Sequence, residues 1–378
     1  MPRTCVIVES VAAFRRQDWD RCFPGVIEGW EYYRAVEEAG IGEFEWRYFA
    51  VLDGDTPIAV VPAFLTVYRL DSTIQGPIKR VADWLSRRLP NLLSIPLACL
   101  GSPVTETCHL GFAPDIDDAE KPALLGMLVA ELARLAHGRG IGLMGVKDAR
   151  DVDATLWERC LDGFQRMAGL PTAVLPLPFK TFDAYLANLS AATRKDMRRK
   201  LRAEAVIRID DRTDISDVLD PIMALYEETV ARSDLQFERL TARYFANVLH
   251  HLPENAHCVL YWRDEDLLAF NLVLHSPDCL IDKFIGTSDS ARDYNVYFLS
   301  WMENVRRCIA GGIPIYQSGQ AGYGVKMRLG SRLELNWNYF RHRNPALNVL
   351  LRLVARGVRL DRFDSDIRRA IDDVKRRA

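Results

Sequence analysis

The chain has 378 residues, of which 49% are apolar and 26% charged, and its formal net charge is −2. This composition is typical of a folded globular protein, the length suggests two domains, and the near-neutral charge excludes a general electrostatic attraction to DNA. No apolar run approaches the roughly eighteen residues of a membrane span, and the N-terminal apolar run is too short for a signal peptide. The eight cysteines form no C-x-x-C pair. We therefore expect a cytoplasmic protein without disulfides.

The first half of the chain predicts a hairpin, a helix and a buried strand. Residues 46–52 and 57–67 are apolar runs joined by an Asp-Gly-Asp turn, a pattern typical of a β-hairpin. Leucines at helical spacing predict a helix over about 122–137, followed by a glycine stop and a strand at 141–146. Between hairpin and helix lies an insertion at about 74–107. It carries four basic residues and Trp84 on an expected short helix, either a surface helix or a contact for a membrane or partner.

A strongly basic helix begins just after Ser190. The serine is a good N-cap, and the following residues are strong helix formers. Helical spacing stacks Arg194, Arg198 and Arg202 in one ridge, with Lys195 and Arg199 beside it. Two interpretations stay open: a solvated charged face, or a binding surface for a ligand that carries phosphate or carboxylate.

The second half repeats the order of the first. Residues 258–262 and 267–274 predict another hairpin, residues 296–310 predict a helix that ends at two glycines, and a buried strand follows at 313–316. Between hairpin and helix, the apolar strand 279–286 is interrupted by Asp282 and Lys283. The repeated order predicts two domains of the same topology.

Four short stretches, in this order, resemble the GNAT superfamily of N-acyltransferases, and more narrowly the Fem-type aminoacyltransferases with tandem GNAT folds. The resemblance extends over about residues 45–345. The stretches are Phe182–Leu186, Leu189-Ser-x-x-x-Arg-x-x-x-Arg-Arg199, Ile315–Gly319 and Lys326–Gly330.

The resemblance implies a mixed α/β (α+β) fold with two GNAT-like domains, each a mostly antiparallel central sheet flanked by helices. We expect the first domain at 1–170 and the second, with the active cleft, at 171–344. A helical tail at 345–378 is expected to dock on the second domain, or else on a dimer partner or anionic lipid. The implied reaction is direct attack of an amine on an acyl donor, acyl-CoA or acetyl-CoA in most of the family and aminoacyl-tRNA in the Fem branch.

One departure from the family concerns the donor. CoA-using members carry an Arg/Gln-x-x-Gly-x-Gly/Ala loop whose amides hold the pyrophosphate. The corresponding residues 290–297 contain no glycine. We therefore expect such a nest of amides to be hard to form, which favours a Fem-type or unusual donor. A further alternative is an inactive GNAT-like protein that binds an anionic metabolite or lipid surface.

The candidate catalytic residues are Asp282, as the group that binds the amine or accepts its proton, and Tyr297, as a proton donor to the leaving group. For each, a structural role as a surface charge pair or as core packing is the alternative. The histidines show no metal-ligand spacing, so we predict no metal. The candidate residues for binding donor or substrate are Arg194, Arg198, Tyr294, Gln317, Gly319 and Lys326.

Overall fold

The computed structural model describes residues 3–69, 94–233 and 238–357. Its strands are β1 (Thr4–Val8), β2 (Glu45–Asp53), β3 (Thr56–Arg69), β4 (Ser94–Leu100), β5 (Gly111–Phe112), β6 (Leu143–Arg150), β7 (Gln165–Ala168), β8 (Thr172–Pro176), β9 (Arg208–Arg212), β10 (Ala256–Arg263), β11 (Asp266–His275), β12 (Cys279–Thr287), β13 (Ile315–Gln317), β14 (Arg332–Glu334) and β15 (Asn336–His342). Its α-helices are α1 (Arg16–Cys22), α2 (Trp30–Glu38), α4 (Lys121–Gly138), α5 (Ala154–Cys160), α6 (Phe182–Asn188), α7 (Ala191–Lys200), α8 (Leu219–Ala231), α9 (Ala242–His251), α10 (Val296–Gly311), α11 (Tyr323–Arg328) and α12 (Pro345–Gly357). Short 3-10 helices span Val11–Ala13, Asp151–Asp153, Leu201–Val206 and Ser290–Arg292.

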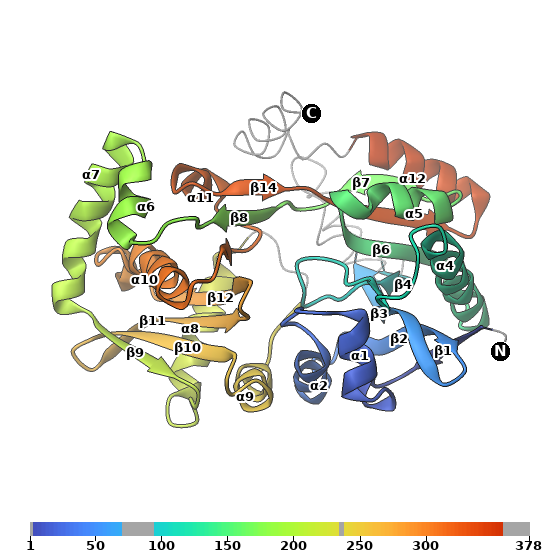
Figure 1. Ribbon diagram of the computed structural model, residues 1–378, viewed down its shortest axis with the longest axis horizontal. Helices are drawn as coiled ribbons and strands as arrows, with labels where there is room; N and C mark the ends of the chain where they lie inside the picture. Colours follow the sequence, from blue (N-terminus) through green and yellow to red (C-terminus); the bar gives the residue numbers. More distant parts are fainter. Residues whose placement is uncertain (1–2, 70–93, 234–237, 358–378) are drawn as a thin grey trace, which may run out of the picture.

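Two sheets form two lobes that lie side by side (Figure 1). One has the order β1-β2-β3-β4-β6-β15-β7, with β5 against β3, and the other has the order β14-β8-β13-β12-β11-β10-β9. In each sheet one pair is parallel, β4 with β6 and β12 with β13, and the chain between its strands carries the long helix α4 or α10. The mixed fold with two mostly antiparallel sheets is confirmed.

The two lobes exchange a strand. The chain leaves β7 in the first sheet and enters the second as β8, between β13 and β14. It later leaves β14 in the second sheet and returns to the first as β15, between β6 and β7. Figure 1 shows β8 and β14 running between the lobes. At the crossing, Gly169 N donates to Asn336 O at 2.8 Å, and Asn336 Nδ2 donates to Leu170 O at 3.0 Å. The exchange makes each sheet depend on chain from the other half.

The helix ends expected from the sequence are confirmed. Ser190 caps α7 through a bond from Thr193 N to its hydroxyl at 3.2 Å. Gly140 and Gly312, just beyond α4 and α10, have φ values of 68° and 67°. This left-handed conformation is one that glycine adopts without strain. Both hairpins also form, as β2–β3 and β10–β11.

Three elements pair or pack differently from what the expected domain limits imply. β15 lies within the range 171–344 but pairs in the first sheet, and β4 lies within the expected insertion but is a core strand. The tail helix α12 packs on β15 and β7, which belong to the first sheet. The basic helix expected around Trp84 lies outside the described residues. Among the described helices, none is long and apolar enough to cross a membrane.

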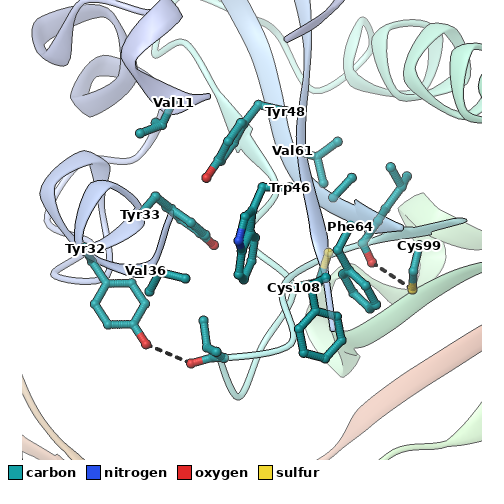
Figure 2. Packing of buried hydrophobic residues seen from close by; sticks show 14 of the residues in the cluster. Val11, Tyr32, Tyr33, Val36, Trp46, Tyr48, Val61, Phe64, Cys99 and Cys108 are labelled. Carbon is teal, nitrogen blue, oxygen red and sulfur yellow. Dashed lines mark hydrogen bonds between the residues drawn. The ribbon is translucent and has the colours of Figure 1, made fainter. Parts of the chain in front are cut away.

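One hydrophobic core runs through both lobes, from Val11 on the first to Phe270 on the second. In the first lobe, the Tyr33 ring of α2 lies edge-on to Tyr48 of β2, with ring centroids 5.7 Å apart, whereas the Tyr32 hydroxyl donates to Val104 O at 2.9 Å (Figure 2). Helix α2 packs on α9 of the second lobe, and the hydroxyls of Tyr32 and Tyr244 lie 2.9 Å apart. The shared core fixes the two lobes against each other.

Candidate active site

The parallel strands β12 and β13 separate after three paired positions. The pairing ends at Ile281 and Gln317, and β12 continues for six residues beyond it. A β-bulge lies at the same point, because Leu272 pairs with Phe284 whereas the adjacent Val273 pairs with Asp282. Bulges bend a strand and redirect its side chains. We call the place where β12 and β13 separate the second split.

Asp282 lies at the second split with both carboxylate oxygens engaged. Asn271 Nδ2 donates to Oδ1 at 2.6 Å, and the Tyr316 hydroxyl donates to Oδ2 at 2.9 Å. Asn304 Nδ2 in turn donates to the Asn271 side chain at 2.9 Å. Burial raises the pKa of Asp282, while the Lys326 ammonium and the two hydrogen bonds oppose that rise. The network holds this half-buried carboxylate in one orientation.

Gln317, Gly319 and Lys326 lie on the other side of the second split, together with Glu106 of the first half. Gln317 Nε2 donates to Glu106 Oε2 at 2.9 Å, and Lys326 Nζ donates to the Ser318 carbonyl. A Cβ on Gly319 would lie 3.1 Å from Glu106 Oε1 and 3.6 Å from Lys326 Nζ. Burial lowers the pKa of Lys326, an effect partly offset by the nearby carboxylates. The three predicted residues do lie together.

Lys283 does not pair with Asp282, since the bulge turns it toward the first half. Its ammonium lies 2.5 Å from Glu28 Oε1, and the two side chains are 6% and 4% exposed. It also donates to Val104 O at 2.8 Å. Burial by itself raises the pKa of Glu28, but Lys283 and His109 together bring it to about 2. This buried ion pair joins the two lobes. The structural alternative for Asp282, an exposed charge pair with Lys283, therefore does not form.

The two tyrosines before and in α10 lie in different surroundings. Tyr297 is half-buried, and a Cβ on Gly322 would lie 3.8 Å from its hydroxyl. Burial and then Asp282 raise the pKa of Tyr297, which keeps its phenol protonated. The Tyr294 hydroxyl instead accepts a hydrogen bond from Arg263, whose guanidinium lies 4.8 Å from the Tyr294 ring centroid. Tyr297 therefore belongs to the second split, and no described contact brings Tyr294 to it.

The basic helix α7 lies against α10 and α11. Lys200 Nζ is 3.2 Å from the centroid of the Phe298 ring, and Arg328 of α11 is 3.6 Å from Asp196. Arg194 donates to Ala187 O at 2.9 Å and to Leu189 O at 3.2 Å, so it caps the end of α6. No described residue pairs with Arg198, which is exposed. Arg198, rather than Arg194, is thus the cation free to meet a ligand.

The N-terminus of α10 begins with a left-handed residue although residues 290–297 contain no glycine. Asn295 adopts φ 54° and ψ 32°, a left-handed geometry that asparagine tolerates better than most residues. Among the described groups, none accepts a hydrogen bond from the amides of Val296 and Tyr297. Free amides after a left-handed residue, at the positive end of a helix dipole, can hold an anion. The lack of glycine makes such a nest hard to form, yet Asn295 in the left-handed region leaves two amides free at this place in the described structure.

This geometry predicts opposite results for two substitutions of Asn295. Asn295→Gly should keep both stability and donor binding, whereas Asn295→Val should cost about 1–2 kcal/mol and weaken donor binding, because a branched Cβ clashes in the left-handed region. Urea unfolding and donor-induced shifts of the melting temperature measure the two effects. Equal behaviour of the valine and glycine variants would contradict the geometry.

The corresponding split of the first sheet lacks this chemistry. Its last parallel pair is Leu100 with Val146, where the second sheet has Ile281 with Gln317. Gly101 therefore stands at the position of Asp282, and Gly145 at that of Tyr316. Gly101 lies so close to the chain that a Cβ there would be 2.9 Å from Lys147 O, and Cys108 N donates to Asp148 O at 2.8 Å. The loop after β4 therefore packs against the end of β6. Just past this split Lys147 and Asp148 of β6 form an ion pair at 2.5 Å, and Lys147 donates to Thr105 O at 3.2 Å. These charges bind each other and the loop after β4, and among the described residues this split has no counterpart of the Asp282–Asn271–Tyr316 network.

Sequence reasoning missed Glu106 and Glu28. Glu106 had a usable signal, because it is the only Asp, Glu, Lys or Arg between Arg88 and Asp115. An isolated charge in an apolar stretch is expected to be either exposed or specifically paired. Glu28 offered no such signal, since its partner Lys283 lies 255 residues away in the sequence.

Comparison with known proteins agrees with this architecture. Residues 191–327 match the model of the acetyltransferase (GNAT) domain family. FemX superposes with a TM-score of 0.60 at 13% identity, over 93% of this chain and 100% of the FemX chain. The C-terminal domain of a putative lysylphosphatidylglycerol synthetase from Agrobacterium fabrum gives 0.53 at 13% identity, over 93% and 99% of the two chains. A tandem GNAT protein from the clavulanic acid biosynthesis pathway gives 0.52 at 11% identity, over 91% and 99%.

The chain is therefore a tandem GNAT-fold protein. Residues 191–327 match the acetyltransferase (GNAT) domain, and the resemblance to tandem GNAT and Fem-type proteins is confirmed at the level of the fold. A search of curated protein sequences gives no significant match.

Proposed function

We propose that the protein is an N-acyltransferase. It transfers an acyl group from acyl-CoA, acetyl-CoA or a similar thioester to the amine of a small molecule or of a cell-envelope or natural-product precursor in the cytoplasm, by direct attack. The observation that supports this most is the difference between the two splits. The position just past the last parallel pair holds Asp282 in the GNAT domain but Gly101 in the first half, and Gly145 stands where the second half has Tyr316.

The proposed roles follow from the surroundings of each residue. Asp282, whose two oxygens are held by Asn271 and Tyr316, attracts the acceptor amine. Tyr297, which stays protonated, donates to the leaving thiolate. The amides that begin α10 bind phosphates of the donor, with Arg198 on α7 as a counter-charge. Lys326 and the open backbone at Gly319 stabilise the developing oxyanion.

A Fem-type transferase that uses aminoacyl-tRNA is the second candidate. The full-length match to FemX and the exposed cations of α7 favour it, because a basic surface suits a polyphosphate donor. It predicts that tRNA binding weakens steeply as salt is added, since counterions are released on binding. If the donor is an acyl-CoA, its binding should depend much less on salt concentration.

A thermal-shift experiment separates these donors. The protein is heated with acetyl-CoA, with longer acyl-CoAs and with total tRNA. A donor at about a hundred times its Kd should add about 2.7 kcal/mol to the folded state. We expect stabilisation by an acyl-CoA, reduced in Arg198→Ala and unchanged in Arg159→Ala, an exposed arginine on α5 of the first half.

Each other outcome has a definite meaning. Stabilisation by tRNA alone would replace the thioester donor with the Fem-type one. No shift with any donor would contradict both enzymes and favour a GNAT-like binding protein. Arg194→Ala is not used as the probe, because it would also remove the cap of α6.

A further inference from the structure

The carboxyl group of Glu106, a residue of the first half of the chain, lies at the second split. Glu106 lies on the loop between β4 and β5, and its main-chain carbonyl accepts bonds from Gln320 Nε2 at 3.0 Å and Asn336 Nδ2 at 3.2 Å. Two residues earlier, Val104 O accepts from Lys283 at 2.8 Å. Residues of the second half thus hold this loop from several directions, so the position of Glu106 is set by the interface between the lobes.

The carboxyl groups of Asp282 and Glu106 differ in whether an oxygen atom is left to accept a hydrogen bond from a ligand. Both oxygens of Asp282 accept hydrogen bonds from uncharged side chains that are themselves fixed. Glu106 uses Oε2 for Gln317, while Oε1 faces Gly319, where no side chain intervenes. Glu106 therefore has an oxygen available to a ligand at the split, whereas Asp282 would have to break its network to take a proton.

The electrostatics of Glu106 suit proton transfer near neutral pH. Burial raises its pKa to about 7, against the lowering by Lys283 and Lys326. A base is most effective when its pKa lies near the working pH. Asp282 stays fixed in its hydrogen-bond network and Glu106 exchanges a proton, a division of roles between two acidic groups in different environments.

We propose that Glu106 of the first half is a catalytic residue, the base that takes a proton from an acceptor that arrives as a primary ammonium ion. This inference rests on the proposed acyltransferase function and names its acceptor class. Asp282 and Glu106 both lie close enough to Lys326 to favour its charged form. Two carboxyl groups beside one ammonium give the split a negative balance, so a cationic amine is the acceptor that it attracts.

The proton balance of the step is complete. Glu106 takes one proton from the ammonium, and the freed nitrogen lone pair forms the bond to the acyl carbon. The carbon–sulfur bond then breaks, and the thiolate leaves with a proton from Tyr297. Tyr297 regains that proton from the nitrogen of the new amide, and Glu106 releases its own to solvent. One amide, one thiol and one proton are formed from the ammonium ion and the thioester.

The test measures release of free thiol from an acyl-CoA with a panel of primary amines, for wild type, Glu106→Gln, Glu106→Asp and the exposed control Glu334→Gln. We expect Glu106→Gln to lower kcat by about a hundredfold or more, with the donor-induced melting shift unchanged. Glu106→Asp should recover part of the rate. The wild-type rate should fall on the acid side of about pH 7, and this limb should be absent in Glu106→Gln.

Two outcomes would overturn the inference, and they are distinguishable. Turnover by Glu106→Gln at the wild-type rate, with the same acid limb, would remove Glu106 from the mechanism and leave the acyltransferase intact. Release of thiol by the wild type with none of the amines would overturn the proposed function and this inference with it. A loss of rate accompanied by a lost donor shift would show a structural role instead.

Discussion

Asp282→Asn is expected to lower kcat by about a hundredfold or more while the protein stays folded. The amide has the shape of the carboxylate, so its oxygen still accepts one of the two hydrogen bonds that Asn271 and Tyr316 now donate. The negative charge that attracts the acceptor amine is lost. Lys326 loses a carboxylate that favours its charged form, so its pKa should fall further.

The measurement is thiol release together with urea unfolding of the same samples. Asp211→Asn is the matched control. That carboxylate is also in the second lobe and also paired, accepting from Arg307 at 2.7 Å, but it lies on the edge strand β9, away from the split. It should keep the wild-type rate. If Asp282→Asn instead kept the wild-type rate of thiol release, Asp282 would have no part in catalysis. Donor binding without thiol release by the wild type would indicate a GNAT-like binding protein.

Lys283→Met is expected to cause the largest loss of stability, about 3–5 kcal/mol, because it leaves Glu28 buried and unpaired between the lobes. Lys283 and Glu28 approach to 2.5 Å with side chains 6% and 4% exposed, so water does not replace the missing partner. The double variant Lys283→Met/Glu28→Leu removes both charges. It should recover much of the loss, since apolar replacements of a buried pair are often neutral or stabilising.

Urea unfolding at neutral pH measures these differences. The control is Lys121→Met, whose partner Asp118 is 95% exposed and whose loss should cost less than about 1 kcal/mol. A loss for Lys283→Met no larger than this control would contradict a buried pair. An equal loss in the double variant would show that the packing of Lys283, and not its charge, is what matters.

The same pair predicts how stability depends on pH. The pKa of Glu28 is about 2 in the folded protein, below its ordinary 4.5. The unfolded chain therefore binds more protons between these values, so the contribution of Glu28 is complete above about 4.5 and is lost as pH falls toward 2. The raised pKa of Lys283 acts at the other end, where stability falls as pH rises above its ordinary 10.5. The double variant should lack both dependences.

The two lobes have unequal parts in this architecture. The first sheet has Gly101 and Gly145 where the second has Asp282 and Tyr316, and the loop after β4 packs against the end of β6. That same loop supplies Glu106 and the carbonyl of Val104 to the second lobe. The first half thus supports the site of the second half and, by our proposal, completes it.

Local chemistry determined what the sequence alone could predict. Ser190 before a helix-forming run, Gly140 and Gly312 after apolar helices, and the turns of the two hairpins are decided by residues within a few positions of each other. The repeated order of these elements predicted two copies of one topology. The grouping of Gln317, Gly319 and Lys326 also followed from their nearness in the chain.

Only the tertiary structure decided the rest, because it depends on partners far apart in the sequence. The exchange of β8 and β15 pairs chain segments of opposite halves, and neither strand differs in pattern from one that stays in its own sheet. The bulge in β12 separates Asp282 from Lys283 and sends each to its own partners. Glu106 reaches Gln317 across 211 residues. A buried charge is stabilised by the partner that folding brings to it, and the local sequence pattern does not identify that partner.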